Sequence, residues 1–131
     1  MCNVNYLAVL VSAITFFILG GIWYSPKVFG HMWGMAAHIK EKKEGHPKSV
    51  YVISFILALI SAWVFGCLLG TDGTLEKSMQ LSALIGFGCV GTQFGINYLF
   101  AGRTWKMLLI DAGYHGVQFL LYGLVFGLWP R

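Results

Sequence analysis

Two titratable side chains, Asp111 and His115, stand one helical turn apart inside the apolar run 103–129. An ionisable group in hydrocarbon is costly, and such residues in membrane spans usually serve a function. Gln118 and Tyr122 follow at spacings of three and four residues, which places all four side chains on one helix face. A polar face on a membrane helix should look toward other protein rather than toward lipid.

A carboxylate beside an imidazole suits two different roles. The pair can bind a polar solute or relay a proton, or it can clamp neighbouring helices as a structural pair. Asp111 lies only about 6 to 8 Å beyond Lys106 along a helix, within reach of basic residues such as Lys27 and Arg103. Both roles stay open, and the rarity of ionisable residues in spans favours a functional one.

Polar residues from other apolar runs are expected at the same depth as this pair. The first run ends at Tyr24, and the third carries Gln93, Asn97 and Tyr98 near its end. Arg103 would stand at the mouth of the site as a gatekeeper charge. The sequence therefore predicts a polar or ligand-binding cluster made of Tyr24, Gln93, Asn97, Arg103, Asp111, Tyr114, His115 and Gln118.

The leading hypothesis is an oligomeric transporter or channel for a small solute or a proton, with Asp111 and His115 as its titratable centre. The alternative is a non-transporting accessory, structural or lipid-binding membrane protein. No catalytic motif is recognisable, so an enzyme is not expected. No carboxylate or cysteine completes a metal set with His31, His38 and His46, so neither a metal nor another cofactor is expected.

The composition indicates which elements must position these residues. Of 131 residues, 57% are hydrophobic and 11% are charged, against about 25% charged in a soluble domain. Four apolar runs have the roughly 20 residues that a membrane span needs. The predicted fold is an all-α, polytopic bundle of four transmembrane helices in a single domain, 1–131. Its spans are expected at about 6–24, 50–69, 78–101 and 107–129.

The segment after the first run has a helical pattern of its own. Its apolar residues are Val28, Phe29, Met32, Trp33, Met35, Ala36 and Ile39. This spacing predicts an amphipathic helix that lies in the membrane interface. Aromatic and basic residues at span ends suit the headgroup level. The predicted interfacial anchors are Trp23, Trp33, Trp105 and Lys106.

Basic residues are distributed unequally between the two sides of the predicted bundle. The connections after the first and third spans carry seven of the nine Lys and Arg residues, and only Lys77 and Arg131 fall on the other side. The positive-inside rule places the two basic connections in the cytoplasm and both termini outside. We expect a multi-pass protein of the bacterial inner membrane. Its basic face would meet anionic lipid, and nucleic acid is not an expected partner.

Cysteines and glycines give weaker indications. Cys2, Cys67 and Cys89 have no CxxC spacing, and we expect no disulfide framework. GxxxG patterns occur at 66–70, 91–95 and 123–127. They predict close helix contacts, either within one chain or between copies. Because four short helices enclose little volume, a transport path would require a homo-oligomer, a dimer or larger.

Two stretches together carry a family resemblance: WYSPKVFGHMW near the first span and FAGRTWKMLLIDAGYHGVQFLLYGLVFGLW at the end. With this combination, the chain resembles the small bacterial membrane proteins grouped as domain-of-unknown-function family 1761. The resemblance covers nearly the whole chain and implies the four-span layout. It implies no activity, because the family has none assigned.

Overall fold

The computed structural model describes residues 2–37 and 45–129, and the described part contains helices and no strand. The helices are α1 (Tyr6–Trp23), α2 (Gly30–Ala36), α3 (Lys48–Leu69), α4 (Leu75–Ala83), η1 (Leu84–Gly91), α5 (Thr92–Phe100) and α6 (Trp105–Leu128). The π-helical segment η1 joins α4 and α5 into one long helix. That helix, α1, α3 and α6 are each long and apolar enough to cross a membrane. The predicted class, an all-α four-helix membrane bundle, is confirmed.

Side-chain caps set several helix ends. The Thr74 hydroxyl accepts a hydrogen bond from the Lys77 amide at 3.3 Å, so the third long helix begins three residues earlier than predicted. Thr104 caps α6 in the same way, through the Met107 amide. Such caps satisfy amides that the first helical turn leaves unpaired.

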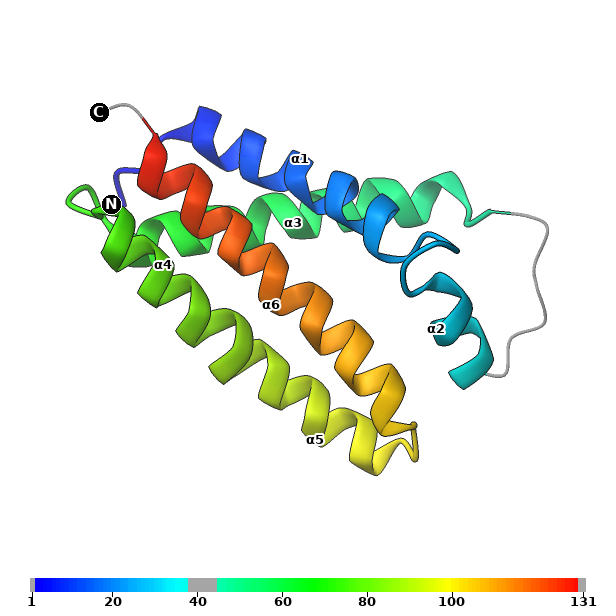
Figure 1. Ribbon diagram of the computed structural model, residues 1–131. Helices are drawn as coiled ribbons and strands as arrows, with labels where there is room; N and C mark the ends of the chain where they lie inside the picture. Colours follow the sequence, from blue (N-terminus) through cyan, green and yellow to red (C-terminus); the bar gives the residue numbers. More distant parts are fainter. Residues whose placement is uncertain (1, 38–44, 130–131) are drawn as a thin grey trace.

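The four long helices form two pairs. Helix α1 lies along α3, and α4, η1 and α5 lie along α6 (Figure 1). The pairs converge where the chain begins and α6 ends, and they diverge at the opposite end, near α2 (Figure 1). We call these the convergent and divergent ends. Helix α6 contacts every other helix and is the most buried of the four long helices.

The convergent end holds the hydrophobic core. Its buried residues are Val4, Ala8, Val9, Ala62, Phe65, Phe119, Tyr122 and Phe126. Glycines let the helices approach closely here. A Cβ on Gly66 would lie 2.7 Å from Val4 Cγ1, and one on Gly123 would lie 2.5 Å from Ser82 Oγ. By contrast, a Cβ on Gly88 would meet nothing within 4 Å.

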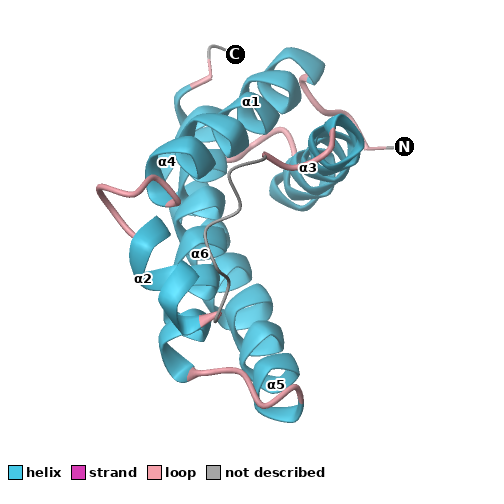
Figure 2. Ribbon diagram, turned by 90° about the vertical axis from the view of Figure 1, so that its right-hand side faces the viewer, coloured by secondary structure: helices cyan, strands magenta, loops and turns pink. Residues whose placement is uncertain are grey.

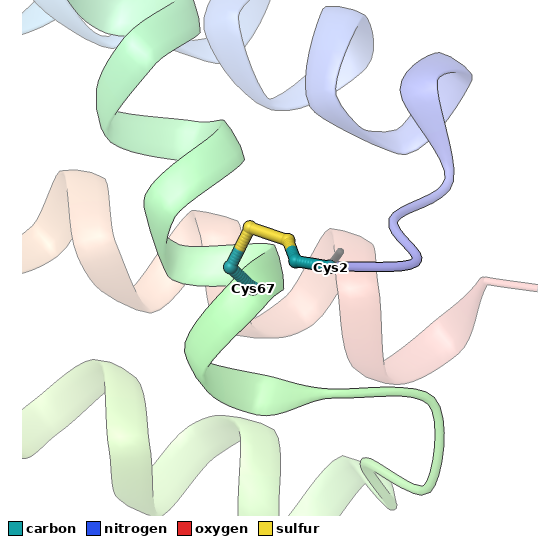
Figure 3. Close-up of a disulfide and its surroundings, with 2 residues drawn as sticks. All are labelled: Cys2 and Cys67. Atoms are coloured by element: carbon teal, nitrogen blue, oxygen red, sulfur yellow. A yellow bond between two sulfur atoms is a disulfide. The ribbon is translucent and has the colours of Figure 1, made fainter.

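A disulfide joins Cys2 to Cys67 at the same end, with a Cα–Cα distance of 5.3 Å (Figure 3). The expectation of no disulfide was therefore wrong. The two cysteines are 65 residues apart in sequence, and only the packing of the chain start against the last turns of α3 brings them together. Cys89 is free and exposed.

Helix α2 lies beside α6 in the space between the diverging pairs (Figures 1 and 2). The chain turns back sharply before it. A Cβ on Gly30 would lie 2.2 Å from the Tyr24 carbonyl oxygen, so this turn requires glycine. Helix α2 is shorter than the predicted amphipathic segment. Several residues of the sequence predictions lie outside the described residues: His38, Ile39, Lys40, Lys42, Lys43 and Arg131.

Candidate functional site

The Asp111 carboxylate is buried in α6, where it is 7% exposed. Its Oδ1 accepts a hydrogen bond from the Tyr24 hydroxyl at 2.5 Å. Its Oδ2 accepts from Trp33 Nε1 at 3.2 Å and from the Tyr98 hydroxyl. The three donors come from the end of α1, from α2 and from α5, so one carboxylate ties three segments to α6. We call Asp111 and these three donors the Asp111 latch.

Neighbouring contacts reinforce the attachment of α1 to α6. Trp23 Nε1 donates to the Ile110 carbonyl at 3.0 Å, so adjacent aromatic residues bind adjacent residues of α6. One turn further along, the Tyr114 hydroxyl donates to the Phe16 carbonyl at 2.9 Å. Within the segment 23–26, the Trp23 and Tyr24 side chains therefore point into the bundle and bind α6.

No cation among the described residues takes part in the latch. Among the described residues, neither Lys27, Arg103 nor Lys106 forms an ion pair with Asp111. Neutral phenol and indole dipoles hold the carboxylate instead. Hydrogen bonds to a charged group contribute about 1.5 to 3 kcal/mol each, so the latch is a strong structural contact.

His115 has a separate set of partners and no hydrogen bond to Asp111. Its Nδ1 pairs with Gln118 Oε1 at 3.0 Å, and Gln118 Nε2 donates to the Tyr122 hydroxyl at 2.7 Å. That hydroxyl donates in turn to the Ala58 carbonyl at 3.4 Å. The imidazole stacks on Phe94 with a centroid distance of 4.8 Å.

His115 lines a cavity of about 450 Å³ between α1, α3, α6 and the third long helix. Its polar lining consists of Tyr24, Ser54, Ser61, Tyr114, His115 and Gln118. Its apolar lining consists of Phe16, Leu57, Ala58, Val90, Phe94 and Phe119. A second cavity of about 540 Å³ shares Phe16, Tyr24, Ser54 and Tyr114 and extends toward the start of α3.

The remaining predicted cluster residues lie elsewhere. Gln93 and Asn97 are exposed and have no hydrogen-bond partner among the described residues. Asn97 and Arg103 line a pocket of about 330 Å³ together with Trp33 and Tyr98, two residues of the latch. The structure therefore brings Tyr24, Tyr114 and Gln118 to the predicted pair and leaves Gln93, Asn97 and Arg103 apart from its hydrogen bonds.

The predicted interfacial anchors also differ in placement. Trp105 is 67% exposed and Lys106 is exposed, whereas the Trp23 and Trp33 indoles bond to α6.

The sequence did not predict Trp33 as a donor to Asp111, and it placed Tyr98 at the depth of Asp111 without including it in the predicted cluster. Tyr98 stands 13 residues before Asp111, across the tight turn between two predicted spans, which is the signal that places the two residues at one depth. Trp33 gave no signal, since its indole was expected at the membrane surface. Ser54 and Ser61 line the cavity, and nothing in the sequence distinguishes them from other small residues of a span.

Four long apolar helices around the Asp111 carboxylate and an interhelical cavity define a polytopic membrane protein of the four-helix class. The family model described as protein of unknown function (DUF1761) matches residues 7–127, so this chain belongs to that family. No curated protein and no solved structure matches the chain.

Proposed function

We propose that this protein binds a small amphipathic molecule that enters from the bilayer, and that the cavity beside His115 is the binding site. The observation that carries the proposal is the cavity itself. Its volume of about 450 Å³ and its apolar walls with a few polar groups match the usual character of ligand sites. Bundles commonly bind ligands between facing helices in this way.

The lining residues support entry from the side. Leu57 of α3 lines the cavity and is also 59% exposed, so the cavity reaches the outer surface of the bundle. Helix α3 packs mainly on α1, and its contacts with the third long helix are concentrated in α4. Lipid-soluble molecules would therefore reach His115 between α3 and α5.

In this proposal the Asp111 latch is a positioning device. It fixes α2 and the end of α1 across the divergent end, where the helix pairs are not held together by a hydrophobic core. The latch thereby keeps the cavity walls at a constant separation, and His115 supplies the polar contact to the ligand.

Transport is the second candidate, and one observation favours it. The 450 Å³ cavity and the 330 Å³ pocket at Arg103 lie against different members of the latch, Tyr24 and Tyr98. Breaking the latch would connect these two spaces, so Asp111 would be the inner gate for a small solute or a proton. The core at the convergent end would have to open as well, which is why binding is the leading proposal.

We place the divergent end in the cytoplasm of a bacterial cell, next to anionic lipid. Lys27 and Arg103 lie in the connections at this end, and Lys48 and Lys106 lie in the first turns of α3 and α6. The Cys2–Cys67 disulfide lies at the opposite end, as expected if that end faces an oxidising compartment. The charge count and the disulfide support the same orientation independently.

We assign a homo-oligomer contact to the outward face of α5. Gln93 and Asn97 are exposed there without hydrogen-bond partners among the described residues, and unpaired amides in hydrocarbon are costly. An amide both donates and accepts, so the same face of a second copy can satisfy it.

Photolabelling tests the binding proposal. The probe is octanol that carries a diazirine in its chain, added to the protein in nanodiscs, with the crosslinked residues mapped by mass spectrometry. We expect labels on cavity residues such as Val90 and Phe94. Ser61→Trp should abolish them by filling the cavity, while Ile60→Trp on the exposed face should not. Labels restricted to lipid-facing residues in all three proteins would refute the proposal.

A further inference from the structure

His115, Gln118, Tyr122 and Ala58 are joined by consecutive hydrogen bonds. The donor and acceptor in each bond can be assigned by starting from Ala58. The Tyr122 hydroxyl has two partners besides Gln118, the Ala58 backbone carbonyl at 3.4 Å and the Ser61 hydroxyl. The carbonyl can only accept, so Tyr122 donates its single hydrogen on this side. Tyr122 must then accept from Gln118, and the amide nitrogen Nε2 of Gln118 lies 2.7 Å away. The side-chain amide of Gln118 is thereby fixed in one orientation.

This orientation determines the tautomer of His115. Gln118 directs its carbonyl oxygen at His115 Nδ1, 3.0 Å away. Since an amide oxygen only accepts, Nδ1 carries the hydrogen of the neutral ring. The other ring nitrogen, Nε2, is then a bare acceptor. Nε2 has no hydrogen-bond partner among the described residues, and the ring lines the cavity.

The rest of the cavity restricts the ligand further. Among the described residues that line the cavity, none is Asp, Glu, Lys or Arg, so a charged ligand would lose its hydration without compensation. Aromatic rings dominate the walls, with Phe16, Phe94, Tyr114 and Phe119 around the imidazole. Such walls favour a flat aromatic group through edge and stacking contacts.

We propose that the ligand is a neutral phenol with an apolar tail, and that its hydroxyl donates a hydrogen bond to His115 Nε2. This inference rests on the proposed function and specifies the ligand class of the same cavity. A phenol combines the three required properties: a donor for Nε2, an aromatic ring for the walls and no charge. Its tail would leave the cavity past the exposed side of Leu57.

Two probes that differ only in the donor test the inference. They are 4-hexylphenol and its methyl ether, 4-hexylanisole, each used to displace the diazirine octanol from the protein in nanodiscs. One neutral hydrogen bond corresponds to roughly a fivefold difference in affinity, so we expect the phenol to displace the label about fivefold better. His115→Phe retains a ring against Phe94 and removes Nε2, and it should abolish the preference for the phenol over the ether.

A spectroscopic measurement tests the tautomer separately. In ¹⁵N-histidine-labelled protein without ligand, His115 should show a protonated Nδ1 and an unprotonated Nε2. The phenol, and not the ether, should shift the Nε2 resonance toward its hydrogen-bonded value.

The outcomes separate the two proposals. Equal displacement by both probes, displacement by neither, or a protonated Nε2 in the free protein would overturn the phenol inference. Each of these results leaves binding of octanol in the cavity intact. Absence of cavity labelling by the diazirine octanol itself would refute the proposed function.

Discussion

Asp111 accepts three hydrogen bonds, and none of them comes from a cation or from His115. The two residues that first suggested a single titratable centre therefore act on different surroundings. Asp111 organises the divergent end, and His115 faces a cavity. Residues one turn apart on a helix can be neighbours along its surface and still have different hydrogen-bond partners.

Replacing Asp111 should destabilise the protein. Asp111→Asn puts an amide NH₂ in the place of one carboxylate oxygen, so at least one aromatic donor loses its acceptor. We expect a loss of about 2 to 4 kcal/mol in the free energy of unfolding, measured by denaturant titration in mild detergent. Tyr6→Phe is the matched control, because Tyr6 is 74% exposed. An Asp111→Asn protein as stable as the Tyr6→Phe protein would show that the latch is not structural.

Single donors of the latch should have smaller effects. Tyr98→Phe removes one hydroxyl from the carboxylate and leaves the ring contact with Phe94 in place. We expect a loss of about 1.5 to 3 kcal/mol in unfolding free energy. In the Asp111→Asn background the same substitution should have less effect, because the two residues share one interaction. Full additivity in this double-mutant cycle would contradict a direct contact.

At the level of elements, α2 depends on the latch. A helix of seven residues is not stable alone in water, and none of its residues is buried. The Trp33 indole provides the hydrogen bond that joins α2 to the Asp111 carboxylate of α6.

Trp33→Phe should therefore release α2 while leaving the long helices intact. Loss of one hydrogen bond to a charged group corresponds to roughly tenfold faster local opening. We expect hydrogen–deuterium exchange of the amides in 30–36 to accelerate by about that factor, with no change in α3 or α6. The exposed Met35→Leu is the control. Unchanged exchange in α2 would show that other contacts hold it.

Glycines at helix contacts differ sharply in their surroundings. A Cβ on Gly66 would clash with Val4 and Phe126, whereas one on Gly21 would meet nothing within 4 Å. We expect Gly66→Ala to lower the unfolding free energy by about 1 to 3 kcal/mol. Gly21→Ala should not lower it, since alanine is the better helix former. The reverse order of stability would contradict the observed packing of α1, α3 and α6.

For the whole molecule, the Cys2–Cys67 disulfide bears on both the stability of the fold and its orientation in the membrane. It closes a loop between residues 65 apart, which corresponds to at most about 4 kcal/mol of stabilisation in the chain-entropy description. Cys2→Ser should lower stability within this limit, and Cys89→Ser should have no effect because Cys89 is unpaired. In intact cells, a membrane-impermeant maleimide should label Cys67 only after reduction. Labelling that requires permeabilised cells would reverse the proposed orientation.

Much of this architecture could be predicted, because span length and apolarity depend on local sequence. The third long helix shows what the sequence did not predict, which is the direction in which its polar side chains face. Its polar residues Gln93 and Asn97 were expected inside, but they face outward while Tyr98 reaches Asp111. The rotation of a helix about its axis depends on packing partners distant in sequence. The disulfide was missed although the predicted topology already placed Cys2 and Cys67 at the same end.

The central claim is that an amphipathic molecule occupies the cavity beside His115. Nuclear Overhauser contacts from 4-hexylphenol to methyl groups, in the protein in nanodiscs, test it most directly. Ala58 is the most informative reporter, because it lines the cavity and is only 4% exposed. We predict contacts from the probe to the methyl groups of Ala58 and Val90. Contacts only to outward residues such as Leu84 and Leu99 would contradict the claim.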